Sequence, residues 1–106
     1  MPVYTVARFQ VRPEAREQAE RAMHEFAMYV RKELDDSAWT TYRDPRAPNH
    51  YLSIIVADTP AADDRHRNAA GRQAFVAALN PLVVGEVELT QYELVTSSNL
   101  ARRHRR

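Results

Sequence analysis

Histidine is the side chain whose charge changes most readily near neutral pH, and the chain has four histidines. His66 lies on an expected helix and shares a face with Ala62 and Ala69, at spacings of four and three, so it should point towards the core. A histidine in an apolar cleft can act as a general base for an acidic hydroxyl group. The alternative is a partly buried histidine that bonds a backbone carbonyl. The remaining histidines are expected on the solvent side of a helix, in a hairpin and in the tail, at His24, His50 and His104.

Trp39 and Tyr51 are large rings with one polar edge, which suits the walls of a flat aromatic binding site. They fall on the two expected strands that flank one hairpin, so we expect them to be near neighbours in the sheet. Tyr29 lies at the margin of the apolar stripe of an expected helix and is a third candidate for the wall of a cavity. Packing in the core or against a second subunit is the alternative for these rings.

Arg8 and Asn68 are the polar candidates for substrate binding. Arg8 lies on the first expected strand, where it either pairs with Glu88 or Glu93 of the last strand or meets an anionic substrate. Asn68 either donates a hydrogen bond to a substrate oxygen or caps the helix that ends there.

Metal and nucleotide sites are not expected. The chain has no cysteine, and no two histidines have the spacing of metal ligands. Asp63 and His66 are three residues apart but lack a third ligand. The only glycines are Gly71 and Gly85, so there is no glycine-rich loop to cradle a phosphate.

The elements that must position these side chains follow from hydrophobic periodicity and turn signals. We expect strands at Val3–Phe9, Ala38–Arg43, Tyr51–Ala57 and Val84–Val95, a helix from Pro13 to Leu34, and a second helical segment from Thr59 to Leu79 that breaks near Gly71. A turn-rich loop, DPRAPN at 44–49, joins the second and third strands. The order β-α-β-β-α-β predicts a ferredoxin-like α+β fold with an antiparallel sheet.

The third strand predicts a partner subunit. Its sequence LSIIVA, at 52–57, is almost continuously apolar, which is typical of a strand buried on both faces. Two helices on one side of the sheet leave the other side bare. We therefore expect a homodimer with twofold symmetry that covers this second face.

Length and charge indicate one small domain, expected at residues 1–96, with a basic and disordered tail at 97–106. Without the four arginines of the last six residues, 11 basic side chains stand against 14 acidic ones, a net charge of −3. This balance argues against a nucleic-acid-binding face on the domain. No apolar run approaches the roughly 20 residues that span a bilayer, and the first residues lack a signal-peptide pattern, so we expect a cytoplasmic protein without membrane contact.

The order of the elements, the hairpin start YRDP at 42–45, His66 on the helix after the third strand, and AFVAALNPLVVGEVELTQYELV at 74–95 belong together. Together they resemble the antibiotic biosynthesis monooxygenase family over about residues 3–95. Members of that family are dimeric α+β barrels, and the resemblance implies the same arrangement here.

The resemblance also implies a reaction. It implies oxidation of an aromatic polyketide, a hydroquinone or a related phenol by O2 as co-substrate, without flavin, metal or haem. His66 would be the catalytic base, and the residues that bind the substrate would be Trp39, Tyr51, Tyr29, Arg8 and Asn68.

The chain departs from the family pattern at several positions. The family's third strand usually ends with a glutamate and an aromatic residue, often tryptophan, where this chain has Ile55, Val56 and Ala57. The haem-degrading branch has a ligating histidine where Val76 stands, so haem degradation is not expected.

These departures keep an alternative open: a non-catalytic or ligand-binding dimer of the same fold, or a cyclase-like enzyme that needs no O2. An open cavity beside His66 would favour the enzyme, and side chains that fill this space would favour the ligand-binding protein.

Overall fold

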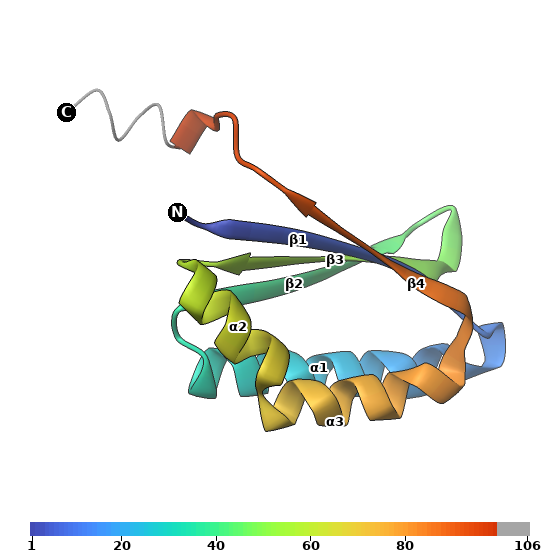
Figure 1. Ribbon diagram of the computed structural model, residues 1–106. Helices are drawn as coiled ribbons and strands as arrows, with labels where there is room; N and C mark the ends of the chain where they lie inside the picture. The colour runs from blue at the N-terminus through green and yellow to red at the C-terminus, as the bar shows by residue number, and fades with distance from the viewer. Residues whose placement is uncertain (100–106) are drawn as a thin grey trace.

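The computed structural model describes residues 1–99, so the tail predicted at 97–106 lies outside the described residues from position 100 onward. The strands and helices are β1 (Val3–Val11), α1 (Arg16–Glu33), β2 (Ser37–Asp44), β3 (Ala47–Ala57), α2 (Pro60–Asn68), α3 (Ala70–Leu79) and β4 (Val83–Tyr92). The four strands form one antiparallel sheet in the order β2-β3-β1-β4, and the helices lie together on one side of it (Figure 1). The predicted ferredoxin-like α+β fold is confirmed.

α1 packs on the sheet along one apolar face. Its buried residues are spaced by four, three and four positions, which is the periodicity of a helix face: Ala19, Met23, Phe26 and Val30. The helix begins at Arg16, later than predicted, because Pro13–Ala15 forms a separate 3-10 turn. A 3-10 turn is common at the start of an α-helix, where the first N–H groups have no helical partner.

The hairpin between β2 and β3 is tighter than the sequence predicts. Asp44 pairs with Ala47, so only Pro45 and Arg46 remain in the turn instead of the expected loop over 44–49. The Asp44 carboxylate accepts a hydrogen bond from the backbone N–H of Arg46 at 2.9 Å, and this local contact closes the turn. The two strands are longer as a result.

The second helical segment consists of two helices, and the break lies at Ala69 rather than near Gly71. Ala69 has an extended backbone, with φ −67° and ψ 140°, between the end of α2 and the start of α3. The predicted start of the segment is confirmed, because the Thr59 hydroxyl accepts a hydrogen bond from the Ala62 N–H at 3.1 Å. Gly71 therefore lies inside α3.

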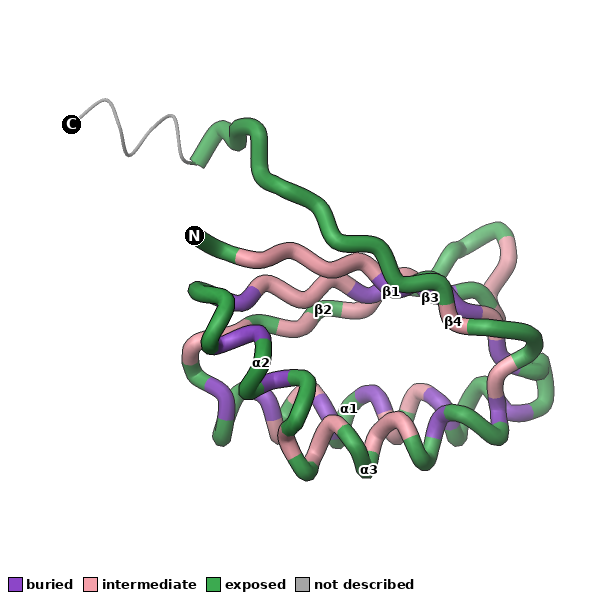
Figure 2. The backbone as a smooth tube through the Cα atoms, in the orientation of Figure 1, coloured by how far each residue is buried: buried purple, intermediate pink, exposed green. Residues whose placement is uncertain are grey.

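The core lies between the helices and the sheet, where Figure 2 shows buried segments facing one another. Strand β3 shows how the sheet divides its residues: Tyr51, Ser53 and Ala57 are buried towards the helices. Residues of the opposite face of β3, such as Ile54, are only partly buried in a single chain. None of the described helices is long and apolar enough to cross a membrane.

The contact between Gly71 and Tyr29 gives a stability prediction. In an ordinary helix, replacing glycine by alanine stabilises by about 1 kcal/mol. A Cβ on Gly71 would stand 2.5 Å from three atoms of the Tyr29 ring, so we expect Gly71→Ala to lower the free energy of unfolding by about 1–3 kcal/mol instead. Chemical denaturation measures it. The loss should shrink in a Tyr29→Leu background, and a stabilised single variant would contradict the prediction.

Candidate functional site

A cavity of about 370 Å³ lies between α1 and the strands β2 and β3, and we name it the α1–β2 cavity. Its lining residues are Glu20, Met23, His24, Ala27, Trp39, Thr40, Thr41, Tyr42, Arg43 and Tyr51. Trp39 and Tyr51, predicted as the walls of one site, therefore do line one cavity. They are not neighbours across the hairpin, because the strand register sets Trp39 opposite Ile55 and Tyr51 opposite Arg43.

Three polar side chains of this cavity are bonded to one another. Arg43 donates from Nε and Nη2 to the two carboxylate oxygens of Glu20, at 2.9 and 2.6 Å. The Tyr51 hydroxyl donates to Oε2 of the same carboxylate at 2.6 Å. The β2–β3 register sets Arg43 beside Tyr51, and α1 supplies Glu20 from the margin of its apolar face. A two-pronged arginine–carboxylate pair holds both partners in a defined orientation.

The charges of this trio follow from its contacts. The hydrogen bond from Arg43 holds the pKa of Glu20 below its ordinary value, although partial burial works in the opposite direction. Burial, and then the hydrogen bond to the Glu20 carboxylate, raises the pKa of Tyr51 to about 12, while Arg43 acts against this rise. At neutral pH Glu20 is thus an anion and Tyr51 a neutral phenol that donates its proton.

His66 points into the core, as its helix face predicts, and is only 1% exposed. Its ring meets the Phe26 ring edge-on, with 5.6 Å between the centroids, and neither ring nitrogen has a hydrogen-bond partner. Burial lowers the pKa of His66 below its ordinary value; Arg72 adds to this effect and Asp63 opposes it. The imidazole is therefore neutral at pH 7.

Aromatic rings fill the space beside His66. Phe26 stacks on Phe75 with a centroid distance of 4.7 Å, and Trp39 packs edge-on against both rings, at 5.0 and 5.5 Å. Trp39 lines the α1–β2 cavity, whereas Phe26 and His66 do not. His66 is therefore connected to the cavity only through the Phe26 and Trp39 rings.

The other candidate residues lie elsewhere. Tyr29 packs beside Phe26, with 6.4 Å between ring centroids, and lies over α3. Asn68 is exposed, and its amide donates to the backbone carbonyl of Asp64 at 2.9 Å, within its own helix. The structure thus brings two of the six candidates, Trp39 and Tyr51, into one cavity.

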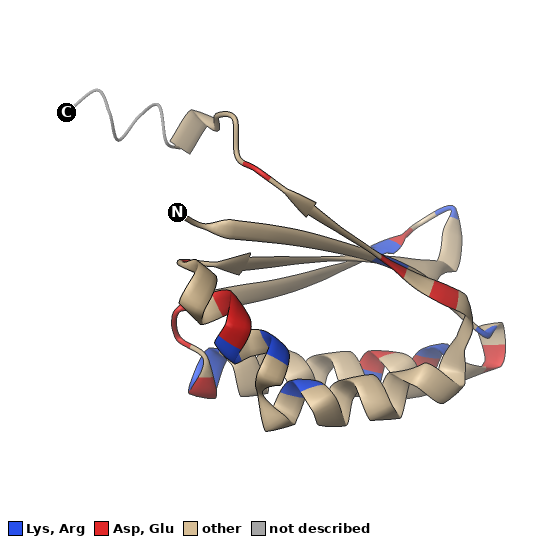
Figure 3. Cartoon of the chain, in the orientation of Figure 1, with Lys and Arg blue, Asp and Glu red and all other residues tan. Residues whose placement is uncertain are grey.

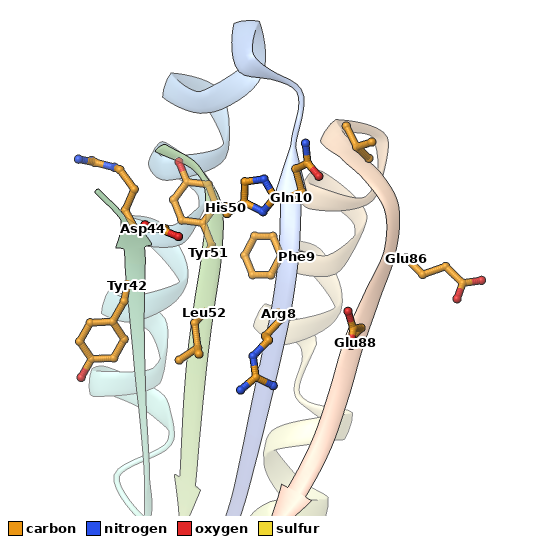
Figure 4. Close-up of a pocket in the computed structure, with 12 residues that line it drawn as sticks. Arg8, Phe9, Gln10, Tyr42, Asp44, His50, Tyr51, Leu52, Glu86 and Glu88 are labelled. Atoms are coloured by element: carbon orange, nitrogen blue, oxygen red, sulfur yellow. The ribbon is translucent and has the colours of Figure 1, made fainter. Parts of the chain in front are cut away.

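Arg8 lies on the far face of the sheet, away from the helices. It is exposed on β1 and stands opposite Glu88 of β4 in the strand register. It lines a separate cavity of about 580 Å³ at the hairpin end of the sheet, together with Glu86 and Glu88 (Figure 4). This placement sets Arg8 next to acidic side chains and apart from the α1–β2 cavity.

The sequence analysis missed three residues of the cavity: Glu20, Arg43 and His24. Glu20 is a charged residue between the buried Ala19 and Met23 of α1, and a charge at the margin of an apolar stripe was the available signal. Arg43 belongs to the YRDP stretch that marked the hairpin. His24 is exposed as predicted, yet it lies at the rim of the cavity. Among residues 1–99, no group of three histidine, aspartate or glutamate side chains is arranged to hold a metal ion.

The fold and the cavity define a ferredoxin-like α+β protein with a pocket between its helices and its sheet. Three solved structures share this fold: Rv0793 from Mycobacterium tuberculosis (TM-score 0.82, 20% identity, 92% of this chain and 99% of the other); a protein named antibiotic biosynthesis monooxygenase (0.81, 19%, 89% and 99%); and SnoaB, described as a cofactor-independent oxygenase, from Streptomyces nogalater (0.78, 21%, 92% and 96%).

These structures are similar over nearly their whole length, and the resemblance expected from the sequence is confirmed at the level of the fold. No family model matches the sequence, and no curated protein matches it. With about one residue in five identical, the likeness establishes the architecture and leaves the activity to be argued from the site.

The buried His66 makes stability depend on pH. Its pKa is lowered from 6.5 in the folded state, so the unfolded chain binds more protons below that pH. We expect this contribution to be fully present above about pH 6.5 and to be lost as the pH falls towards the folded pKa, by at most about 1.4 kcal/mol per pH unit.

Denaturant unfolding between about pH 5 and pH 8 measures this dependence. A His66→Phe variant should lose the part of the slope that His66 supplies, whereas a variant of the exposed His50, His50→Gln, should keep it. An equal slope in all three proteins would contradict the assignment to His66.

Proposed function

We propose that this protein is a small oxygenase that oxidises an aromatic phenol, a hydroquinone or an aromatic polyketide with O2 and uses no bound cofactor. The functional unit of the proposal is the domain at residues 1–96, acting in the cytoplasm. One observation carries it: Trp39 and Tyr51 line a single cavity of about 370 Å³, a size that suits a small aromatic molecule. The shared fold with SnoaB, described as a cofactor-independent oxygenase, supports the same class of chemistry.

The chemistry needs a proton acceptor and an electron-rich substrate. Removal of a phenolic proton gives a phenolate, which can donate an electron to O2, so the substrate supplies the reducing power. For a substrate with a reactive CH2 group, one O2 converts CH2 to C=O and the other oxygen atom leaves as water, which balances atoms and electrons. The active site must therefore bind the ring, accept the proton and exclude bulk water.

His66 is the proposed base. Its neutral imidazole has a free lone pair, because neither ring nitrogen is bonded. Phe26 and Trp39 lie between it and the cavity, so proton transfer requires one of these rings to turn aside when substrate binds. Ring rotation of this kind is a local side-chain motion and needs no change of fold.

The same rings favour a second candidate function, a protein that binds an aromatic ligand without catalysis. The space beside His66 is filled by Phe26 and its neighbours, which is the arrangement expected if the catalytic site has been lost. The α1–β2 cavity would then be the binding site alone.

Oxygen uptake separates the two functions. We expect the purified, metal-free protein to consume O2 with at least one anthrone or hydroquinone faster than buffer does, and His66→Ala to reduce this rate by about a hundredfold, as for loss of a general base. His50→Gln, an exposed histidine of β3, is the matched control and should retain the rate. Binding without O2 uptake, or an active His66→Ala protein, would rule out the proposed role of His66.

The far face of the sheet supports a homodimer as part of the proposal. Five apolar side chains on this face are only partly buried in one chain: Tyr4, Val6, Leu52, Ile54 and Val56. Charged side chains gather at the hairpin end and along β4, and leave the middle of β1 and β3 uncharged (Figure 3). A second copy related by twofold symmetry would place the same apolar strip against itself.

An arginine in this strip should prevent assembly. Ile54 is paired with Val6 and Thr40 at the middle of the sheet, so Ile54→Arg would bury a charge in a twofold interface. Light scattering should report a dimer for the wild type and a monomer for the variant. Met28→Arg, at a residue of α1 that is 72% exposed, should remain dimeric. A wild-type monomer at micromolar concentration would refute the dimer.

A further inference from the structure

The hydroxyl group of Tyr51 has its single proton engaged by Glu20, at an oxygen–oxygen distance of 2.6 Å. A phenolic hydroxyl has one proton and two lone pairs, so a Tyr51 that donates to Glu20 offers only acceptor capacity to anything else. We propose that Glu20 and Arg43 thereby make Tyr51 an acceptor-only contact in the α1–β2 cavity, and that the cavity selects ligands with a ring hydroxyl over their ethers. This inference depends on the cavity assigned under the proposed function.

The direction of the Tyr51 proton is held by two independent contacts. Arg43 binds both oxygens of Glu20 and so fixes the carboxylate plane. The Tyr51 ring is 5% exposed and stacks on Phe9, with 5.5 Å between centroids, which fixes the hydroxyl relative to β1. Glu20 is an anion at neutral pH and has no proton to give back, so the donor and acceptor roles cannot be exchanged.

The lone pairs of Tyr51 are not all taken. Arg43 also stands close enough to lower the pKa of Tyr51, so it occupies at most one lone pair. One acceptor position remains for a ligand in the cavity that Tyr51 lines. A ligand hydroxyl can donate to it, whereas an ether oxygen would face a second oxygen without a proton between them.

The neighbouring hydroxyl does not relax this selection. The Thr41 oxygen accepts from Ser53 at 3.0 Å, and Thr41 donates to the Leu52 carbonyl at 3.5 Å, so its proton is engaged too. Arg43 has further N–H groups, but its side chain is 49% exposed, where water competes for those donors. The half-buried polar surface of the cavity is thus dominated by acceptors.

A pair of probes that differ in one group tests the inference. 1-Naphthol has the hydroxyl and 1-methoxynaphthalene its methyl ether, and titration calorimetry without O2 measures binding in the absence of turnover. We expect the wild type to bind 1-naphthol about tenfold to a hundredfold more tightly, the range for one unmatched hydrogen bond in a partly buried site.

Two variants separate the role of Glu20 from that of Tyr51. Tyr51→Phe removes the acceptor and should weaken 1-naphthol binding towards that of the ether. Glu20→Met frees the Tyr51 proton to turn towards the cavity, so ether binding should improve while 1-naphthol binding is kept. Tyr92→Phe removes a hydroxyl from an exposed tyrosine of β4, outside the α1–β2 cavity, and should leave both affinities unchanged.

Several outcomes would overturn the inference. Equal affinities in the wild type would show that no such selection exists, and failure of both probes to bind would show the same. A preference that survives in both Tyr51→Phe and Glu20→Met would assign it to the size of the methyl group. Weaker 1-naphthol binding in Glu20→Met without improved ether binding would reduce Glu20 to a structural role.

The proposed oxygenase function and this inference can fail separately. Selection of the hydroxyl probe without O2 uptake on any phenol would retain the inference and refute the oxygenase. O2 uptake with equal rates on phenols and their ethers would refute the inference and retain the oxygenase.

Discussion

The helical layer depends on the Phe26 ring. Phe26 is buried on α1 and contacts Tyr29 of its own helix, Trp39 of β2, His66 of α2 and Phe75 of α3, so one side chain joins three helices to the sheet. Stacked and edge-on aromatic contacts each add about 0.5–1.5 kcal/mol beyond burial of area. The break at Ala69 makes this arrangement possible, because an extended residue lets α3 change direction and bring Phe75 onto Phe26.

The same packing decides where a ligand can enter. Around Phe26 the space between helices and sheet is filled with rings, whereas two turns earlier on α1 the neighbours of the sheet include Glu20, Arg43 and Tyr51. Partly buried charges are stable only when they are paired and bonded, and the trio satisfies this condition within the cavity wall. The cavity thus lies where aromatic packing gives way to a bonded polar cluster.

The sequence predicts what local patterns determine. The stripe of α1, the Thr59 cap and the inward direction of His66 each depend on residues within about one or two turns of each other, and the structure agrees with all three. The strand register is different, because it depends on the length of the turn: a two-residue turn at Pro45–Arg46 sets Trp39 opposite Ile55 rather than near Tyr51.

The polar trio is beyond such patterns. Glu20 lies 31 residues from Tyr51 and 23 from Arg43, so only the tertiary fold brings them together. Each of the three residues has an ordinary explanation alone: a helix-surface glutamate, a hairpin arginine and a core tyrosine.

His66 is the residue that packing alone does not explain. A neutral imidazole has one N–H and one lone pair, and here both lie unpaired among aromatic rings. A buried donor or acceptor without a partner costs about 1–3 kcal/mol, which a phenylalanine of similar size at this position would avoid. The sequence alternative of a histidine bonded to a backbone carbonyl does not occur. A hydroxyl group of a bound ligand would satisfy both nitrogens in turn, first as acceptor of the N–H and then as donor to the lone pair. This unmet bonding capacity, one ring away from the cavity wall, is the physical reason to keep His66 in the proposed site.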